Sequence, residues 1–83
     1  MKFKVGQFVK IISPDIHSEE CRNRVLNRIG RIVEIRFTST SEKARPHYPI
    51  KVEFPFKIEG WLTIYSEKEL ELAKKDEAFL EWI

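Results

Sequence analysis

Short segments in which apolar and polar residues alternate are the clearest pattern in this sequence. Residues 50–54 (IKVEF) show the pattern best, because every second side chain is apolar. The two faces of this segment carry Ile50, Val52 and Phe54 on one side and Lys51 and Glu53 on the other. A proline precedes the segment, another follows it, and none lies inside it, which is compatible with a central strand of a sheet. We therefore predict a strand here whose apolar face fills the core.

The same alternation predicts further strands over residues 6–12, 31–37 and 61–65. In the second of these, Val33, Ile35 and Phe37 are expected on one face and Ile32, Glu34 and Arg36 on the other. In the third, Trp61, Thr63 and Tyr65 should alternate with Leu62 and Ile64. A fifth, shorter strand is expected at residues 69–73, with Leu70 and Leu72 on one face.

Helical signals are confined to three segments. Ser66 and Glu69 have the Ser-x-x-Glu spacing of a capping box, which predicts a single helical turn before the last strand. Residues 16–29 fit either a helix or a long irregular loop. At the C-terminus, Phe79, Trp82 and Ile83 are spaced i, i+3 and i+4, as on one face of a short amphipathic helix.

Five short strands separated by turn residues predict an all-β fold. Closure into a small barrel removes the edge strands that an open sheet of this size would expose. The long early loops and the single turn before the last strand favour a five-stranded SH3-like barrel. We expect this barrel to span residues 1–73 and the short C-terminal helix or tail to span residues 74–83.

The composition favours a small protein of a reducing compartment. The chain has 83 residues and one cysteine, Cys21, so an internal disulfide is excluded. It has no apolar run of membrane-spanning length, and its N-terminus lacks the apolar stretch of a signal peptide. We expect the protein in the cytoplasm, or in a reducing compartment resembling the plastid stroma.

Charge is distributed unevenly along the chain. Residues 1–57 contain twelve Lys and Arg against six Asp and Glu, whereas residues 58–83 contain three against seven. This asymmetry indicates an acidic or polyanionic partner for the basic part. The alternative is a mixed, solvated surface without a specific partner.

The sequence offers no convincing catalytic or metal-binding group. His17 and Cys21 are four residues apart, but a tetrahedral zinc site needs about four ligands, and the other histidine, His47, stands alone. The acidic residues form no matched pair, and the three glycines form no phosphate-binding loop. We therefore expect no catalytic residues, no metal, no cofactor and no small-molecule substrate.

Binding is the remaining class of function. Residues 22–31 contain a cluster of four arginines, whose guanidinium groups suit both carboxylates and phosphates. The candidate partner-binding residues are Arg22, Arg24, Arg28 and Arg31, with the aromatic residues Tyr48, Trp61, Tyr65 and Trp82. Trp61 or Trp82 is the expected apolar anchor for a protein partner. Exposed aromatic rings would instead suit nucleic-acid stacking, and packing in a thin core is the alternative for those rings.

Five segments follow one another along the chain: Gly6–Ile11, Arg22–Asn23, Gly30–Val33, Pro49–Phe54 and Glu67–Glu71. In their residues and their order they resemble the variable (alpha) chain of ferredoxin–thioredoxin reductase. A similarity to photosystem I subunit IV, which has the same barrel, is also visible over residues 9–15 and 48–50. The resemblance implies a non-catalytic accessory subunit that docks on a redox protein, with the iron–sulfur cluster held by a separate chain. A small nucleic-acid-binding barrel of the SH3-like or KOW-like type is the alternative function.

Overall fold

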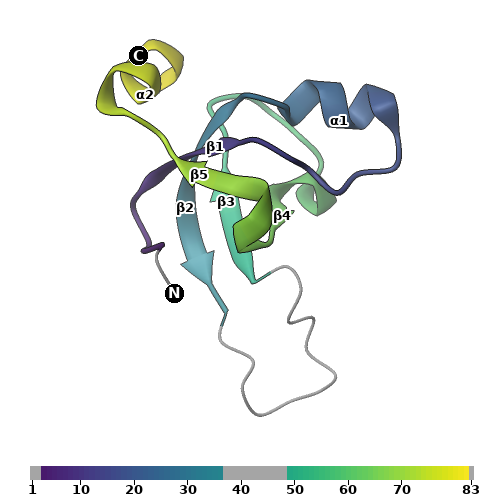
Figure 1. Ribbon diagram of the computed structural model, residues 1–83, viewed down its shortest axis with the longest axis horizontal. Coiled ribbons are helices and arrows are strands. Elements are labelled where there is room, and N and C mark those ends of the chain that lie inside the picture. The colour runs from purple at the N-terminus through teal and green to yellow at the C-terminus, as the bar shows by residue number, and fades with distance from the viewer. Residues whose placement is uncertain (1–2, 37–48, 83) are drawn as a thin grey trace.

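The computed structural model describes residues 3–36 and 49–82 as a small antiparallel sheet with two short helices (Figure 1). The strands are β1 (Phe8–Ile11), β2 (Ile29–Ile35), β3 (Ile50–Glu53), β4 (Ile64–Tyr65) and β5 (Leu70–Leu72). The helices are α1 (Glu19–Val25) and α2 (Lys75–Trp82), and two 3₁₀ turns are η1 (Gly60–Thr63) and η2 (Glu67–Glu69). In the described part of the chain, neither α-helix is both long and apolar enough to cross a membrane.

The five strands form one sheet in the order β4–β3–β2–β1–β5. All four neighbouring pairs are antiparallel, and β1 lies between β2 and β5, with Val9 opposite both Gly30 and Leu72. Among the described residues no ladder joins β4 to β5, so the sheet is not closed by hydrogen bonds. The predicted all-β fold is confirmed at the level of a five-stranded antiparallel sheet, and the closed barrel is not.

One face of the sheet carries the core. The buried residues of this cluster are Phe3, Val9, Ile11, Val25, Ile32, Ile50, Val52, Tyr65 and Leu70. The prediction for β3 is confirmed, because Ile50 and Val52 are buried while Lys51 is exposed. Phe54, beyond the end of β3, is partly buried against the same core.

Gly30, in β2, lies against Val52 and Glu53 of β3 with no room for a side chain. A Cβ atom at this position would lie 2.1 Å from Cγ1 of Val52 and 3.0 Å from the carbonyl oxygen of Glu53. Only a residue without a side chain fits such an approach without displacing the neighbouring strand.

The alternation in β2 is interrupted by a bulge. The register with β3 shifts between Ile32, which is opposite Val52, and Glu34, which is opposite Lys51. Ile32 is fully buried, and the half-buried Ile35 packs against the same core. The two faces expected from simple alternation are therefore wrong here, because a bulge adds a residue on one strand and changes the parity.

Residues 16–29 contain a short helix followed by a tight turn. The hydroxyl of Ser18 accepts a hydrogen bond from the backbone N–H of Cys21 (3.3 Å). Two glutamates in the first turn stabilise the helix further, because their negative charges lie at the positive end of the helix dipole. After α1, Asn27 has a φ of 64°, a conformation that asparagine tolerates better than most residues. Its N–H bonds the carbonyl oxygen of Ile11 (2.7 Å), which ties this turn to β1.

The strand predicted over residues 61–65 is wrong for its first three residues. Residues 60–63 form η1, and only Ile64 and Tyr65 belong to β4. Because the turn of η1 interrupts the alternation before β4, Leu62 and Tyr65 are both buried while Trp61 is exposed. The apolar residues of this segment therefore follow a spacing of three, not the expected spacing of two.

The end of the chain follows the predicted order of turn, strand and helix. The capping box of Ser66 and Glu69 is present in η2. In β5 only Leu70 is buried, and Leu72 is 52% exposed. Of the two leucines expected on one apolar face, only Leu70 therefore packs in the core.

Helix α2 packs on the outer face of β1 and β2. The side chain of Phe8 lies on the face of β1 opposite the buried Val9. Its ring contacts the ring of Trp82 edge to face, with 5.4 Å between the ring centroids. The indole N–H of Trp82 donates to the carbonyl oxygen of Ile29 (3.1 Å). In the predicted apolar stripe of this helix, Phe79 is instead 67% exposed, and Ile83 lies outside the described residues.

Candidate functional site

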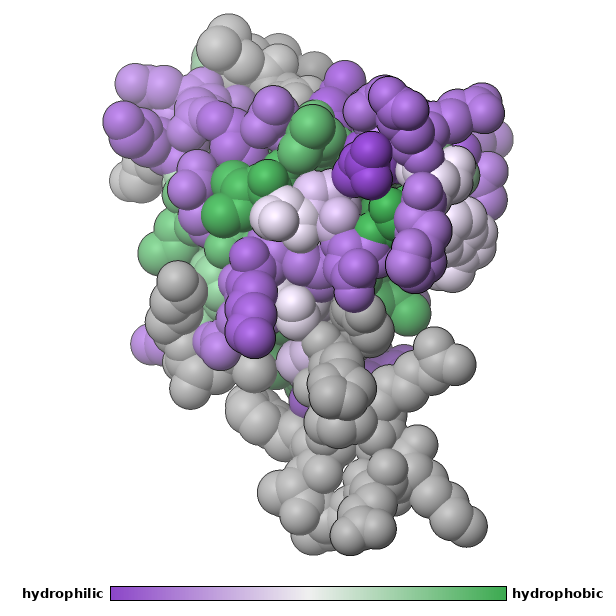
Figure 2. All heavy atoms as spheres, turned by 45° about the vertical axis from the view of Figure 1, so that its right-hand side comes forward, coloured by the Kyte–Doolittle hydropathy of each residue, from purple (hydrophilic) through white to green (hydrophobic). Residues whose placement is uncertain are grey.

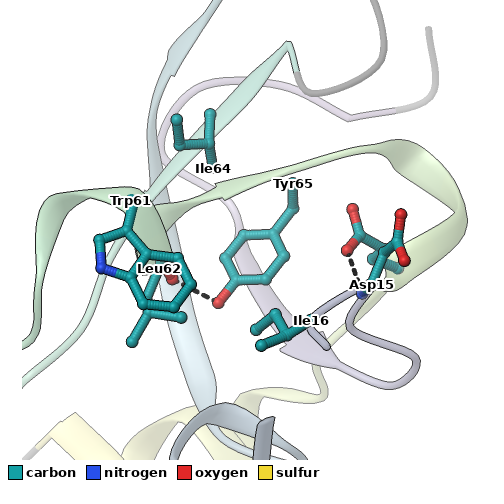
Figure 3. A pocket seen from close by; sticks show the side chains of 7 residues that line it. Asp15, Ile16, Trp61, Leu62, Ile64 and Tyr65 are labelled. Atoms are coloured by element: carbon teal, nitrogen blue, oxygen red, sulfur yellow. Dashed lines mark hydrogen bonds between the residues drawn. The ribbon is translucent and has the colours of Figure 1, made fainter. Parts of the chain in front are cut away.

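A hollow of about 230 Å³ opens between the loop after β1 and the segment from η1 to η2 (Figure 3). Its lining consists of Asp15, Ile16, Trp61, Leu62, Ile64, Tyr65 and Glu69. We call it the Trp61 hollow. In the close view, the ring of Tyr65 lies between the side chain of Trp61 and Asp15, so the tryptophan and the aspartate stand on opposite sides.

Tyr65 and Leu62 form a rigid floor for this hollow. Both are buried, and the Tyr65 hydroxyl donates a hydrogen bond to the carbonyl oxygen of Leu62 (2.5 Å). Burial, with a smaller contribution from the charge of Glu69, raises the pKa of Tyr65 above its ordinary value. The phenol therefore stays neutral at physiological pH and acts here as a structural donor.

Glu69 anchors the loop that forms one wall. Its carboxylate is buried and accepts hydrogen bonds from the N–H of Asp15 (2.6 Å) and from the N–H (2.6 Å) and hydroxyl (3.0 Å) of Ser66. Its carbonyl oxygen also accepts from the N–H groups of Ile12 (2.9 Å) and Ser13 (3.3 Å). These bonds hold Asp15 and Ile16 at the rim, so the shape of the hollow does not depend on a ligand.

Two large apolar side chains are exposed at this rim. Trp61 is 59% exposed and Ile64 is 43% exposed. Ile64 also lines a second hollow of about 120 Å³, whose other lining residues are Arg36, Pro49, Lys51, Gly60 and Thr63. We call it the Lys51 hollow. Figure 2, which shows one face of the molecule, illustrates that exposed apolar side chains occur there as small patches among hydrophilic ones.

The four arginines of the predicted cluster contact four different parts of the chain. Arg22 donates to the carbonyl oxygen of Ile16 (3.3 Å), and Arg24 forms an ion pair with Glu59 (2.9 Å) that lowers the pKa of this glutamate. The guanidinium of Arg28 lies over the ring of Phe56, 4.7 Å from its centroid. Arg31 forms an ion pair with Glu53 (2.6 Å) and lies 5.9 Å from the ring centroid of Trp82. Each of the four guanidinium groups therefore has its own partner within the chain.

The four aromatic candidates also differ in their surroundings. Trp61 is exposed, whereas Tyr65 is 1% exposed and belongs to the core, so its ring does not offer a stacking surface. Trp82 is half-buried against the chain's own sheet. Tyr48 lies outside the described residues.

Sequence reasoning missed most of the Trp61 hollow. Glu69 was recognised only as a capping residue, and nothing local indicated that its second carboxylate oxygen reaches Asp15. Ile64 was expected beside Leu62 on one strand face. Nothing local in residues 61–65 distinguishes the turn η1 from the strand expected there.

Metal-ligating chemistry receives no support from the described residues. Cys21 is a free, half-buried thiol, and no group of three or more His, Cys, Asp and Glu in residues 3–36 and 49–82 is placed to hold a metal ion. His47, the second histidine considered, lies outside these residues.

The arrangement around Trp61 can thus bind a partner through apolar contact and charge. No family model, no curated protein and no solved structure matches this chain.

Proposed function

We propose that this chain is a non-catalytic docking module whose binding surface is the rim formed by Trp61 and Ile64. The observation that carries the proposal is the exposure of these two side chains above a buried, internally hydrogen-bonded floor. Burying large apolar side chains is favourable by about 25 cal/mol per Å², and aromatic residues seated in such hollows dominate many protein interfaces. In this proposal the function of the module is to bind a protein partner that buries Trp61 and Ile64.

The fold supports an SH3-like interpretation of this module. The sheet order β4–β3–β2–β1–β5 and the single turn of η2 directly before β5 are the features expected for that barrel. In such a fold the strands form a scaffold, and the loops and turns between them carry the binding surface. The Trp61 hollow is built from one such loop and two such turns.

The resemblance to the variable chain of ferredoxin–thioredoxin reductase supports a redox protein as the partner. Of the matching segments, Pro49–Phe54 contains β3, and Glu67–Glu71 contains η2 and part of β5. The single cysteine agrees with an accessory role, in which the cluster and redox-active cysteines belong to the partner. We place this complex in a reducing compartment, the cytoplasm or one resembling the plastid stroma.

The arginines contribute less to this proposal than Trp61 does. Arg24 and Arg31 already neutralise Glu59 and Glu53, so their attraction for an acidic partner is reduced. The alternative function in nucleic-acid binding is weakened for the same reason, because a backbone-binding groove requires cations facing a common surface. It is weakened further by the burial of Tyr65.

The experiment is a purification of the tagged protein from the organism that encodes it. We expect an iron–sulfur protein to co-purify with the wild type, and Trp61→Ala to reduce its recovery by roughly tenfold or more, as for an interface hot spot. Phe79→Ala is the matched control, because Phe79 is also exposed but lies on α2. Recovery of RNA in place of a redox protein, or full recovery with Trp61→Ala, would contradict the proposal.

A further inference from the structure

We infer that the Trp61 hollow receives a cationic side chain, lysine or arginine, from a protein partner that places an apolar side chain on Ile64. This inference rests on the proposed docking function and adds the chemistry of the partner's binding segment. Three observations carry it: the charge of the lining, the position of the exposed indole, and the charges of the neighbouring hollow.

The charged groups that line the Trp61 hollow are both acidic. They are Asp15 and Glu69, and the other five lining residues carry no charge at neutral pH. The carboxylate of Glu69 is held by Ser66 and by the N–H of Asp15, so it contributes a negative field from a fixed position. Asp15 is exposed and lines the same hollow. A cation is therefore favoured in this hollow and an anion is disfavoured.

Trp61 supplies the opposite wall. Its indole is more than half exposed and stands across the ring of Tyr65 from Asp15 (Figure 3). A guanidinium or ammonium group bound over the ring of Tyr65 would lie in the negative field of the two carboxylates, and the exposed indole ring would attract it through its quadrupole. The chain already uses this kind of pair internally, since Arg28 lies over Phe56 at 4.7 Å.

The size of the hollow suits a side chain. Its volume of about 230 Å³ is below the roughly 300 Å³ at which small-molecule sites begin. The apolar part of the lining, from Ile16, Leu62 and Ile64, would contact the methylene groups of a long cationic side chain.

The Lys51 hollow defines the polarity of the bound segment. It shares Ile64 with the Trp61 hollow and contains Lys51 and Arg36, the latter paired with Glu34. A partner cation is therefore disfavoured in the Lys51 hollow and favoured in the Trp61 hollow. A partner segment with a basic residue, an apolar residue and an acidic residue would match this order.

The test uses two small probes and the ¹⁵N-labelled full chain. The probes are N-acetyl-leucyl-arginine amide and the same compound with citrulline, which keeps the shape of arginine and removes its charge. Binding is followed by NMR shifts of backbone amides and of the indole N–H of Trp61, assigned with Trp82→Phe. We expect the arginine probe to shift the Trp61 indole and the Asp15 amide at roughly 10 mM, a concentration suited to so small a ligand. The citrulline probe should bind about two- to fivefold more weakly.

Variants identify the groups responsible. Asp15→Asn should weaken the arginine probe about two- to fivefold at low salt and leave the citrulline probe unchanged. Glu20→Gln is the matched control, because it removes an exposed carboxylate from α1 outside both hollows and should change nothing. Equal binding of both probes, shifts elsewhere on the surface, or no shift at all would each overturn the inference.

The inference can fail while the docking function stands. If Trp61→Ala abolishes recovery of the redox partner while the arginine probe does not bind, the docking surface is right and its partner chemistry is wrong. If the probe binds as expected but no partner depends on Trp61, the docking function fails and the cation preference remains.

Discussion

The carboxylate of Glu69 accepts a hydrogen bond from the backbone N–H of Asp15, 54 residues earlier in the chain, at 2.6 Å. The same carboxylate caps η2 through Ser66, so one buried acid joins a local turn to a distant loop. This link places Asp15 and Ile16 opposite Trp61. The candidate site therefore depends on a residue that does not itself need to touch a partner.

Replacing Glu69 by alanine should destabilise the protein by about 2–4 kcal/mol, because the partly buried N–H groups of Asp15 and Ser66 lose a charged acceptor. Denaturant unfolding followed by far-UV circular dichroism measures the change. Glu71→Ala is the control, since Glu71 is exposed on β5 and should cost less than about 0.5 kcal/mol. Equal stability of the two variants would contradict the anchoring role of Glu69.

Gly30→Ala should lower stability by about 1–3 kcal/mol, because the added methyl group overlaps Val52 and approaches the backbone of Glu53. Gly60→Ala provides the comparison. A Cβ atom at Gly60 meets nothing within 4 Å, so the expected change is within about 0.5 kcal/mol. The melting temperatures of both variants measure the difference. If Gly30→Ala is as stable as Gly60→Ala, the strands β2 and β3 do not approach each other as closely at Gly30 as described here.

Trp82→Ala should lower the melting temperature, since it removes the contact with Phe8 and the hydrogen bond to the Ile29 carbonyl. For a half-buried tryptophan we expect about 1–3 kcal/mol, below the range for fully buried rings. Trp82→Phe keeps an aromatic ring and loses only the hydrogen-bond donor, so its melting temperature should lie between those of the wild type and Trp82→Ala. Phe79→Ala should leave the melt unchanged, and a drop as large as that of Trp82→Ala would reverse the assigned orientation of α2.

The ion pair between Lys10 and Glu77 (2.6 Å) makes the attachment of α2 sensitive to acid. The hydrogen bond from Lys10 lowers the pKa of Glu77 below its ordinary value of 4.5. A lowered carboxyl pKa in the folded state stabilises the fold above the ordinary value, and this contribution is lost as pH falls below it. Glu77→Gln should therefore be less stable than the wild type at pH 7, and the difference should disappear in acid. If the difference in stability between the wild type and Glu77→Gln stays constant from pH 7 into acid, the ion pair between Lys10 and Glu77 is not its cause.

Tyr65 should make the fold sensitive to alkali. Its pKa is raised by burial in the folded state, whereas in the unfolded chain it ionises near its ordinary value of 10.0. The fold thus has its full stability below about pH 10 and loses stability as the pH rises above this value. Tyr65→Phe should be less stable at pH 7 by about 1 kcal/mol, from the lost hydrogen bond, and should lose less stability than the wild type between pH 9 and 11. Parallel pH profiles for the two proteins would refute this assignment.

Sequence patterns predicted the parts of the fold whose structure is decided locally. The alternation in residues 50–54 identified β3 and its buried face, and the Ser66–Glu69 spacing identified η2. These succeed because a strand with one buried face imposes a period of two, and a capping box involves only groups three residues apart.

The same patterns failed where long-range contacts decide the structure. The bulge after Ile32 changes the buried face of β2, and no feature of residues 31–37 alone specifies where the extra residue lies. Residues 61–65 alternate as a strand would, yet residues 60–63 form η1, and Leu62 and Tyr65 both reach the core. The arginines are neighbours in the chain, but their surroundings come from glutamates and aromatic rings of other segments.

The amino-acid sequence by itself determined a small, mainly β domain with a capped turn near its end, a C-terminal helix and one cysteine. Only the tertiary structure decided which aromatic residues are exposed and which charged groups already have partners. The physical reason is that burial and ion pairing depend on residues far apart in the chain. Trp61 and Tyr65 are four positions apart, yet one stands at the rim of a hollow and the other forms its floor.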